Sequence, residues 1–101
     1  MKEDEAMLTF EWDENKNRIN KTKHKVSFEE AQTVFYDDHA LLIPDPDHSE
    51  DEERFILLGF SDKARLLLVC HCYRRSETVI RIISARKADA QEADQYNEMG
   101  V

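Results

Sequence analysis

The residues best suited to chemistry lie in two predicted strands that follow each other closely. His71 is in the first, residues 66–73, and Arg81 is in the second, residues 79–87. If the two strands pair as a hairpin, His71 falls near Ile80 or Arg81, so the histidine and the arginine could share a face. A histidine can exchange a proton near neutral pH, and an arginine can stabilise a phosphorane-like transition state. The pair therefore suits metal-independent RNA cleavage; the alternative is a half-buried histidine satisfied by a neighbour.

Residues 79–87 combine the strongest strand signal in the chain with three positive charges. The run carries β-branched residues at period two, and its cations are Arg81, Arg86 and Lys87. One interpretation is a docking or catalytic surface for an anion, and the other is a half-exposed strand with solvated cations. Strict alternation places Arg81 and Arg86 on opposite faces. Both can therefore contact one RNA only if the strand twists, bulges or ends between them.

Metal and nucleotide sites find little support in the residue spacing. The histidines are scattered, and alternation along a strand points His71 away from Cys70 and Cys72. With Gly59 and Gly100 as its two glycines, the chain has no glycine-rich phosphate loop. We therefore predict no metal and no cofactor. The two cysteines lie at the edge of disulfide reach, which predicts free thiols.

Length and composition predict one globular domain over residues 1–101. Hydrophobic residues make up 41% and charged residues 36%, as in a soluble protein with a strongly charged surface. Residues 1–6 are expected to form a flexible acidic extension. No apolar run is long enough to span a bilayer, and the first residues lack the pattern of a signal peptide. We therefore expect a cytoplasmic protein without membrane contact.

The charge is unevenly distributed along the chain. The net charge of −8 opposes indiscriminate attraction to a polyanion. Residues 63–87, however, contain seven Lys and Arg against one acid, Glu77. A local positive patch can therefore exist within an acidic envelope.

Capping signals predict three helices. Asp13 is the N-cap candidate of a polar helix with a thin apolar face. Ser27 and Glu30 form a capping box at the start of a second helix, and Asp89 and Glu92 form another at the start of the last.

Alternating and apolar runs predict the strands. A first strand is expected at residues 7–12, and four more at residues 40–43, 54–60, 66–73 and 79–87. Short connections predict that the last four form an antiparallel meander. The fold class is therefore α+β, with an antiparallel sheet of four to five strands packed against two or three helices.

Three groups of motifs occur in order along residues 10–96. The first is Phe10-Glu11-Trp12-Asp13, Lys16, Lys23-His24-Lys25-Val26-Ser27-Phe28-Glu29-Glu30-Ala31 and Phe35. The second is Pro44-Asp45-Pro46-Asp47-His48-Ser49 with Glu53-Arg54-Phe55, and the third is Arg81-Ile82-Ile83-Ser84-Ala85-Arg86-Lys87-Ala88. Together they resemble the BrnT family of bacterial type II toxins over nearly the whole chain.

The resemblance implies a RelE-like fold and a ribonuclease that arrests growth by cutting RNA. It also implies a cognate antitoxin with a ribbon-helix-helix domain, through which the complex would reach operator DNA indirectly. Residues matching the family's motifs are placed at the RNA site: Lys23, His24 and Lys87 in RNA binding, and His71, Arg81 and Arg86 in catalysis. We expect His71 or His24 to transfer protons, the arginines to bind phosphate, and the product to carry a 2′,3′-cyclic phosphate.

The closing helix departs from the family's pattern. Members often end in a basic helix, whereas this one carries Glu92, Asp94 and Glu98. Acidic charge there weakens nonspecific attraction to RNA. The alternative function is therefore a non-catalytic binding module that serves as antitoxin partner and operon co-repressor.

Overall fold

The computed structural model describes residues 8–45, 53–74 and 78–99. Its elements in chain order are β1 (Thr9–Glu11), α1 (Glu14–His24), α2 (Phe28–Ala31), the 3₁₀ helix η1 (Gln32–Tyr36), β2 (Leu41–Pro44), β3 (Phe55–Phe60), β4 (Leu66–Arg74), β5 (Val79–Lys87) and α3 (Ala90–Met99). The predicted acidic extension at residues 1–6 lies outside the described residues. A hairpin turn is expected from the sequence at residues 74–77; Arg74 still belongs to β4, and residues 75–77 lie outside the described residues.

The five strands form one sheet in the order β1-β5-β4-β3-β2. The meander from β2 to β5 is antiparallel, which confirms the predicted α+β class. Strand β1 pairs in parallel with β5, with Phe10 opposite Ile80, so the sheet is mixed. A parallel neighbour is possible here because the whole chain between β1 and β5 serves as the crossover.

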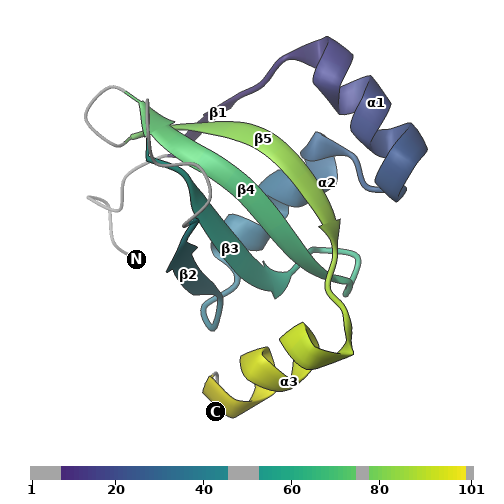
Figure 1. Cartoon of the computed structure of the whole chain (residues 1–101). Helices are drawn as coiled ribbons and strands as arrows, with labels where there is room; N and C mark the ends of the chain where they lie inside the picture. The colour runs from purple at the N-terminus through teal and green to yellow at the C-terminus, as the bar shows by residue number, and fades with distance from the viewer. Residues whose placement is uncertain (1–7, 46–52, 75–77, 100–101) are drawn as a thin grey trace.

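One face of the sheet is covered by α2 and η1 (Figure 1). The Ser27 hydroxyl accepts from the Glu30 N–H at 3.0 Å, so the helix begins where the capping signal predicts. The buried stripe is formed by Phe28 and Ala31 in α2 and by Val34 in η1. These side chains pack on the sheet residues of the main core, which are Leu57, Leu67, Val69, Ile80, Ile82 and Ala85.

Helix α1 is attached to the sheet by amide side chains. Its buried residues are Asn17 and Asn20. The side-chain amide oxygen of Asn17, Oδ1, accepts from the Phe28 N–H at 2.8 Å. Asn20 Nδ2 donates to the carbonyls of Val26 and Ala85, both at 2.8 Å, and its Oδ1 accepts from the Ala85 N–H at 3.2 Å. Asn20 therefore bonds both main-chain groups of Ala85 on β5, past the point where β1 ends.

Helix α3 packs against part of the opposite face of the sheet. Tyr96 joins Leu58 and Leu68 in a second, smaller core. The Tyr96 hydroxyl donates to Asp37 Oδ2 at 2.7 Å, and burial together with this carboxylate raises the pKa of Tyr96 to about 12. The predicted capping box is confirmed: the Glu92 N–H donates to Asp89, and the Asp89 N–H donates to Glu92.

Replacing Asn20 by Ala should destabilise the fold by about 2–4 kcal/mol, because it leaves three buried main-chain groups without this partner. Chemical denaturation followed by circular dichroism measures the free energy of unfolding. The exposed Asn97→Ala is the matched control and should stay within about 0.5 kcal/mol of wild type. Equal stability of N20A and wild type would show that these bonds do not hold α1.

Candidate functional site

A β-bulge in β5 decides which side chains face the open side of the sheet. Cys70 lies opposite Ser84, but the next residue of β4, His71, lies opposite Ile82, so Ile83 is an extra residue. An extra residue reverses the alternation beyond it. Arg81 before the bulge and Arg86 after it therefore point to the same face of β5, which strict alternation would not allow.

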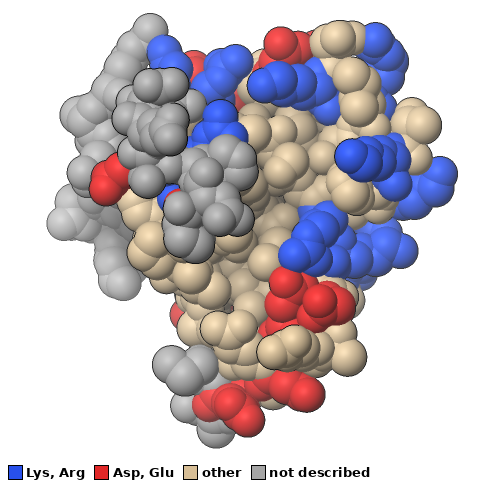
Figure 2. Space-filling view, viewed as in Figure 1, with Lys and Arg blue, Asp and Glu red and all other residues tan. Residues whose placement is uncertain are grey.

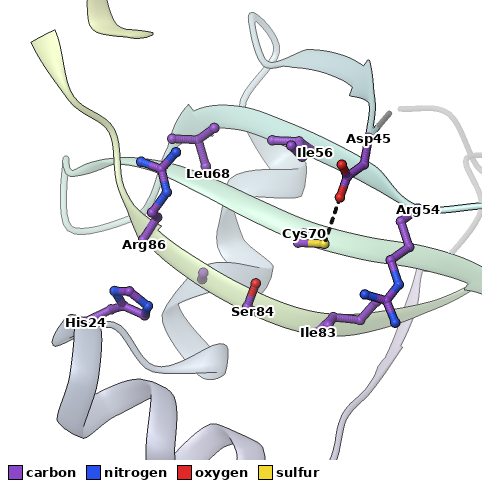
Figure 3. Close-up of a pocket in the computed structure, with 10 residues that line it drawn as sticks. His24, Asp45, Arg54, Ile56, Leu68, Cys70, Ile83, Ser84 and Arg86 are labelled. Carbon is purple, nitrogen blue, oxygen red and sulfur yellow. Dashed lines mark hydrogen bonds between the residues drawn. The ribbon is translucent and has the colours of Figure 1, made fainter. Parts of the chain in front are cut away.

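A pocket of about 380 Å³ lies on this face (Figure 3). Its floor is a row of side chains across three strands, because Ile56 is opposite Cys70 and Cys70 is opposite Ser84. Further lining residues are His24, Asp45, Arg54, Leu68, Ile83, Ala85 and Arg86. Charged groups at the ends of the pocket thus flank a floor that is apolar except for the Ser84 hydroxyl, which is a common composition for a ligand site.

One end of the pocket is formed by His24 and Arg86 (Figure 3). Arg86 makes a bidentate ion pair with Glu92, in which Nη1 lies 3.1 Å from Oε1 and Nη2 lies 2.8 Å from Oε2. The hydrogen bonds raise the pKa of Arg86 and lower that of Glu92. The Arg86 side chain remains 45% exposed, so it can still be reached from solvent.

A second hollow of about 180 Å³ lies along α1 and is lined by Lys16, Ile19, Asn20, Lys23, His24, Ile83 and Ser84. His24, Ile83 and Ser84 line both hollows, so the two adjoin, and we call them together the groove. Figure 2 shows Lys and Arg side chains gathered over α1 and the end of β5, with acidic side chains directly below them. The groove therefore runs along a positive surface although the whole chain is acidic.

The other end of the pocket is formed by Asp45 and Arg54 (Figure 3). The Asp45 N–H donates to the Arg54 carbonyl at 2.9 Å, which holds the two residues side by side. Cys70 Sγ lies 3.9 Å from Asp45 Oδ2. Burial, and next the charge of Asp45, raise the pKa of the Cys70 thiol. Cys70 and Cys72 are both free, as predicted.

His71 lies on the other face of the sheet and is fully buried. Its Nδ1 is 3.0 Å from the Val69 carbonyl, which can only accept, so Nδ1 carries the proton and Nε2 faces the Tyr73 hydroxyl at 3.3 Å. Burial lowers the pKa of His71. The expectation that His71 and Arg81 share a face is wrong, because Arg81 lies opposite Cys72, and His71, the neighbour of Cys72 in β4, points to the other face. The alternative of a satisfied, buried histidine describes it better than a catalytic one.

The remaining predicted residues occupy different positions. His24 and Arg86 line the pocket together, and Lys23 lines the adjoining hollow. Arg81 faces the same side but donates to Glu11 Oε2 at 3.2 Å, away from the pocket lining. Lys87 is exposed opposite Leu67, on the helix-covered side of β5.

Asp45, Cys70 and Ser84 were not predicted as site residues. Cys70 and Ser84 come together through strand register, and Asp45 lies between the strands expected at residues 40–43 and 54–60, outside any predicted element. Among the described residues, no group of three His, Cys, Asp or Glu side chains could hold a metal ion. In the same part of the chain, no helix has the length and apolar character needed to cross a membrane.

Sequence comparison decides the family. The family described as "Ribonuclease toxin, BrnT, of type II toxin-antitoxin system" matches residues 12–92. The chain belongs to this family. It is therefore a BrnT-family ribonuclease toxin with RNA as substrate and an antitoxin as partner. A search of curated proteins gives no significant match.

The fold is that of a solved BrnT toxin. The 1.1 Å crystal structure of the Brucella abortus ribonuclease toxin BrnT superposes with a TM-score of 0.63 at 20% sequence identity. The alignment covers 82% of this chain and 99% of the Brucella chain. At this identity the likeness supports the fold, and the family assignment stands on the sequence match.

Replacing Asp45 by Asn should lower the pKa of Cys70, because it removes a negative charge that disfavours the thiolate. The measurement is the pH dependence of Cys70 alkylation in a Cys72→Ala background, where only this thiol reacts. Wild type should show a midpoint above the ordinary thiol value, and D45N a midpoint at lower pH. Asp94→Asn is the control of equal charge change; an identical shift in both would place Asp45 away from the thiol.

Proposed function

We propose that the pocket between Arg86 and Asp45 is the RNA-cleavage site of this BrnT-family toxin and that cleavage needs no metal. The observation that carries the proposal is the joint placement of His24 and Arg86 at one end of a pocket that adjoins a lysine-lined hollow. Lys23 and Lys16 would follow the RNA backbone along α1. In this proposal Arg86 binds the scissile phosphate and His24 handles the proton.

The chemistry needs few groups. A neutral imidazole of His24 would accept the proton of the 2′-hydroxyl, whose oxygen attacks the adjacent phosphorus. The bond from phosphorus to the 5′-oxygen breaks, that oxygen takes a proton from water, and a 2′,3′-cyclic phosphate remains. Arg86 would stabilise the extra charge on the phosphoryl oxygens. To do so it exchanges the Glu92 carboxylate for phosphate, and the cost is small because a partly exposed ion pair is worth only about 0–1 kcal/mol.

The roles of the other predicted residues follow from their places. We assign proton transfer to His24 and not to His71, because His71 has no exposed surface and both its ring nitrogens are engaged. Arg81 and Arg74 both form an ion pair with Glu11, so this group of three side chains keeps a net positive charge. We propose that Arg81 and Lys87 attract RNA at longer range and do not touch the scissile phosphate.

The domain boundaries, the cellular location and the type of antitoxin also belong to this proposal. We propose that residues 1–101 act as a single toxin domain in the cytoplasm, where RNA is accessible. The antitoxin would carry a ribbon-helix-helix domain, cover the groove along α1, and connect the toxin to operator DNA. Support for the antitoxin type comes from the motifs that this chain shares with the BrnT family.

The second candidate is a binding module without catalysis. It is favoured by the Arg86–Glu92 ion pair, which occupies the guanidinium that catalysis would need. Expressing the chain without antitoxin separates the two functions. Growth arrest with RNA degradation supports the nuclease, whereas harmless accumulation of folded protein with intact RNA supports the binding module.

Replacing Arg86 or His24 by Ala should reduce RNA cleavage by at least about 100-fold, because each removes a group at the reacting phosphate. Purified protein is assayed in EDTA, and the products are tested for 2′,3′-cyclic phosphate ends. The exposed Arg18→Ala and His39→Ala, outside both pocket linings, are matched controls and should keep wild-type rates. Strict metal dependence, or full activity of folded R86A and H24A, would contradict the site.

Replacing Glu92 by Gln should tighten RNA binding about two- to fivefold, because Arg86 loses its competing carboxylate. Glutamine preserves the capping interaction with Asp89, so α3 should remain intact. Glu98→Gln changes the net charge equally on the same helix and is the control. Fluorescence anisotropy with a labelled RNA measures the affinity of both variants. An equal increase in affinity in the two variants would mean that only net charge matters.

A further inference from the structure

Asp45 is a nearly buried carboxylate in the pocket wall. Its residue is only 9% exposed, yet its side chain lines the pocket at the end away from His24 and Arg86 (Figure 3). The proposed phosphate chemistry does not use it. A negative charge in a site that attracts a polyanion needs its own reason, because it repels the substrate's phosphates.

We propose that this end of the pocket binds a guanine base of the RNA, with Asp45 as the residue that selects it. The inference rests on the proposed cleavage site and names the base that it recognises. Guanine presents two adjacent donors, N1–H and N2–H, which match the two oxygens of a carboxylate. In adenine, cytosine and uracil the corresponding donor is flanked by an acceptor, which would face a carboxylate oxygen unfavourably.

Arg54 supplies the complementary chemistry. Its side chain lines the same end of the pocket, beside Asp45 through the main-chain bond between the two residues. Guanine carries the acceptors O6 and N7 on its other edge, and arginine is the residue that most often contacts them. A carboxylate has about four lone-pair sites, so Asp45 can hold protein donors and accept from a base together.

The rest of the pocket suits a base attached to a bound phosphate. Ile56, Leu68 and Ile83 provide apolar surface for the faces of the ring. Ser84 and Cys70 lie between the two ends, as the cross-strand register and Figure 3 place them. A nucleotide entering with its base toward Asp45 would leave its phosphate toward Arg86 and His24. Cleavage would then occur next to guanosine.

The test measures binding, so that it does not depend on catalysis. Short oligouridylates with a single central G, A or C, or with none, carry 2′-O-methyl groups that remove the nucleophile, and their affinities are measured by fluorescence anisotropy. Wild type should bind the G oligonucleotide about tenfold or more tightly than the others. Asp45→Asn should lose this preference, while Asp94→Asn, of equal charge change, should retain it. Replacing the central G by inosine, which lacks the 2-amino group, should weaken wild-type binding without any change in the protein.

The outcomes separate the two proposals. Equal wild-type affinity for all four oligonucleotides, a G preference that survives in D45N, or unchanged binding of inosine would overturn guanine selection while leaving the cleavage site standing. Failure to bind any of the oligonucleotides would overturn both.

Discussion

The site depends on one irregularity in β5 and on the side chain that secures it. The extra residue Ile83 turns the strand, so that Ser84 and Arg86 face the same side as Arg81. Beyond the end of β1, the edge of β5 would expose the main-chain groups of Ala85. The amide of Asn20 occupies that edge and bonds both groups, as a neighbouring strand would. Asn20 belongs to α1, so the same hydrogen bonds fix the position of this helix against β5. His24, the last residue of α1, is thereby placed at the pocket.

Docking a helix through amides has a different consequence from docking it through apolar contacts. A single hydrogen bond contributes only about 1 kcal/mol net, but leaving a buried group unsatisfied costs about 1–3 kcal/mol. A helix attached through amide hydrogen bonds is therefore restricted to few positions relative to the sheet. A helix attached through apolar contacts can shift along the sheet at a smaller cost. Asn17 reinforces this by receiving the N–H of Phe28 at the start of α2. The positions of α1, α2 and β5 are thus coupled, and His24 and Arg86 are placed by one network.

Local sequence patterns predict the helices and strands of this fold well. The site is harder to predict, because it depends on the register in which the strands pair. Caps at Ser27 and Asp89 depend on residues three positions apart, so the sequence alone locates them. The bulge has no such local sign, because Ile82 and Ile83 fit a regular strand equally well. One extra residue in β5 was enough to bring Arg86 to the open face, whereas His71 follows the regular alternation of Leu67 and Val69 toward the helices. Asp45 was missed because its burial comes from β3 and β4, which pairing alone brings beside it.

The acidic character of the chain agrees with a site that selects its RNA. A net charge of −8 weakens long-range attraction to any polyanion, so affinity must come from short-range contacts within the groove. In the proposed site Glu92 would act in the same direction, because an RNA phosphate would have to displace it from Arg86. RNA that offers only phosphates would gain little from that exchange. If the Asp45 end of the pocket binds a base as proposed, RNA that also fills it would gain enough to make the exchange favourable, and selectivity would follow from the same charges that lower nonspecific affinity.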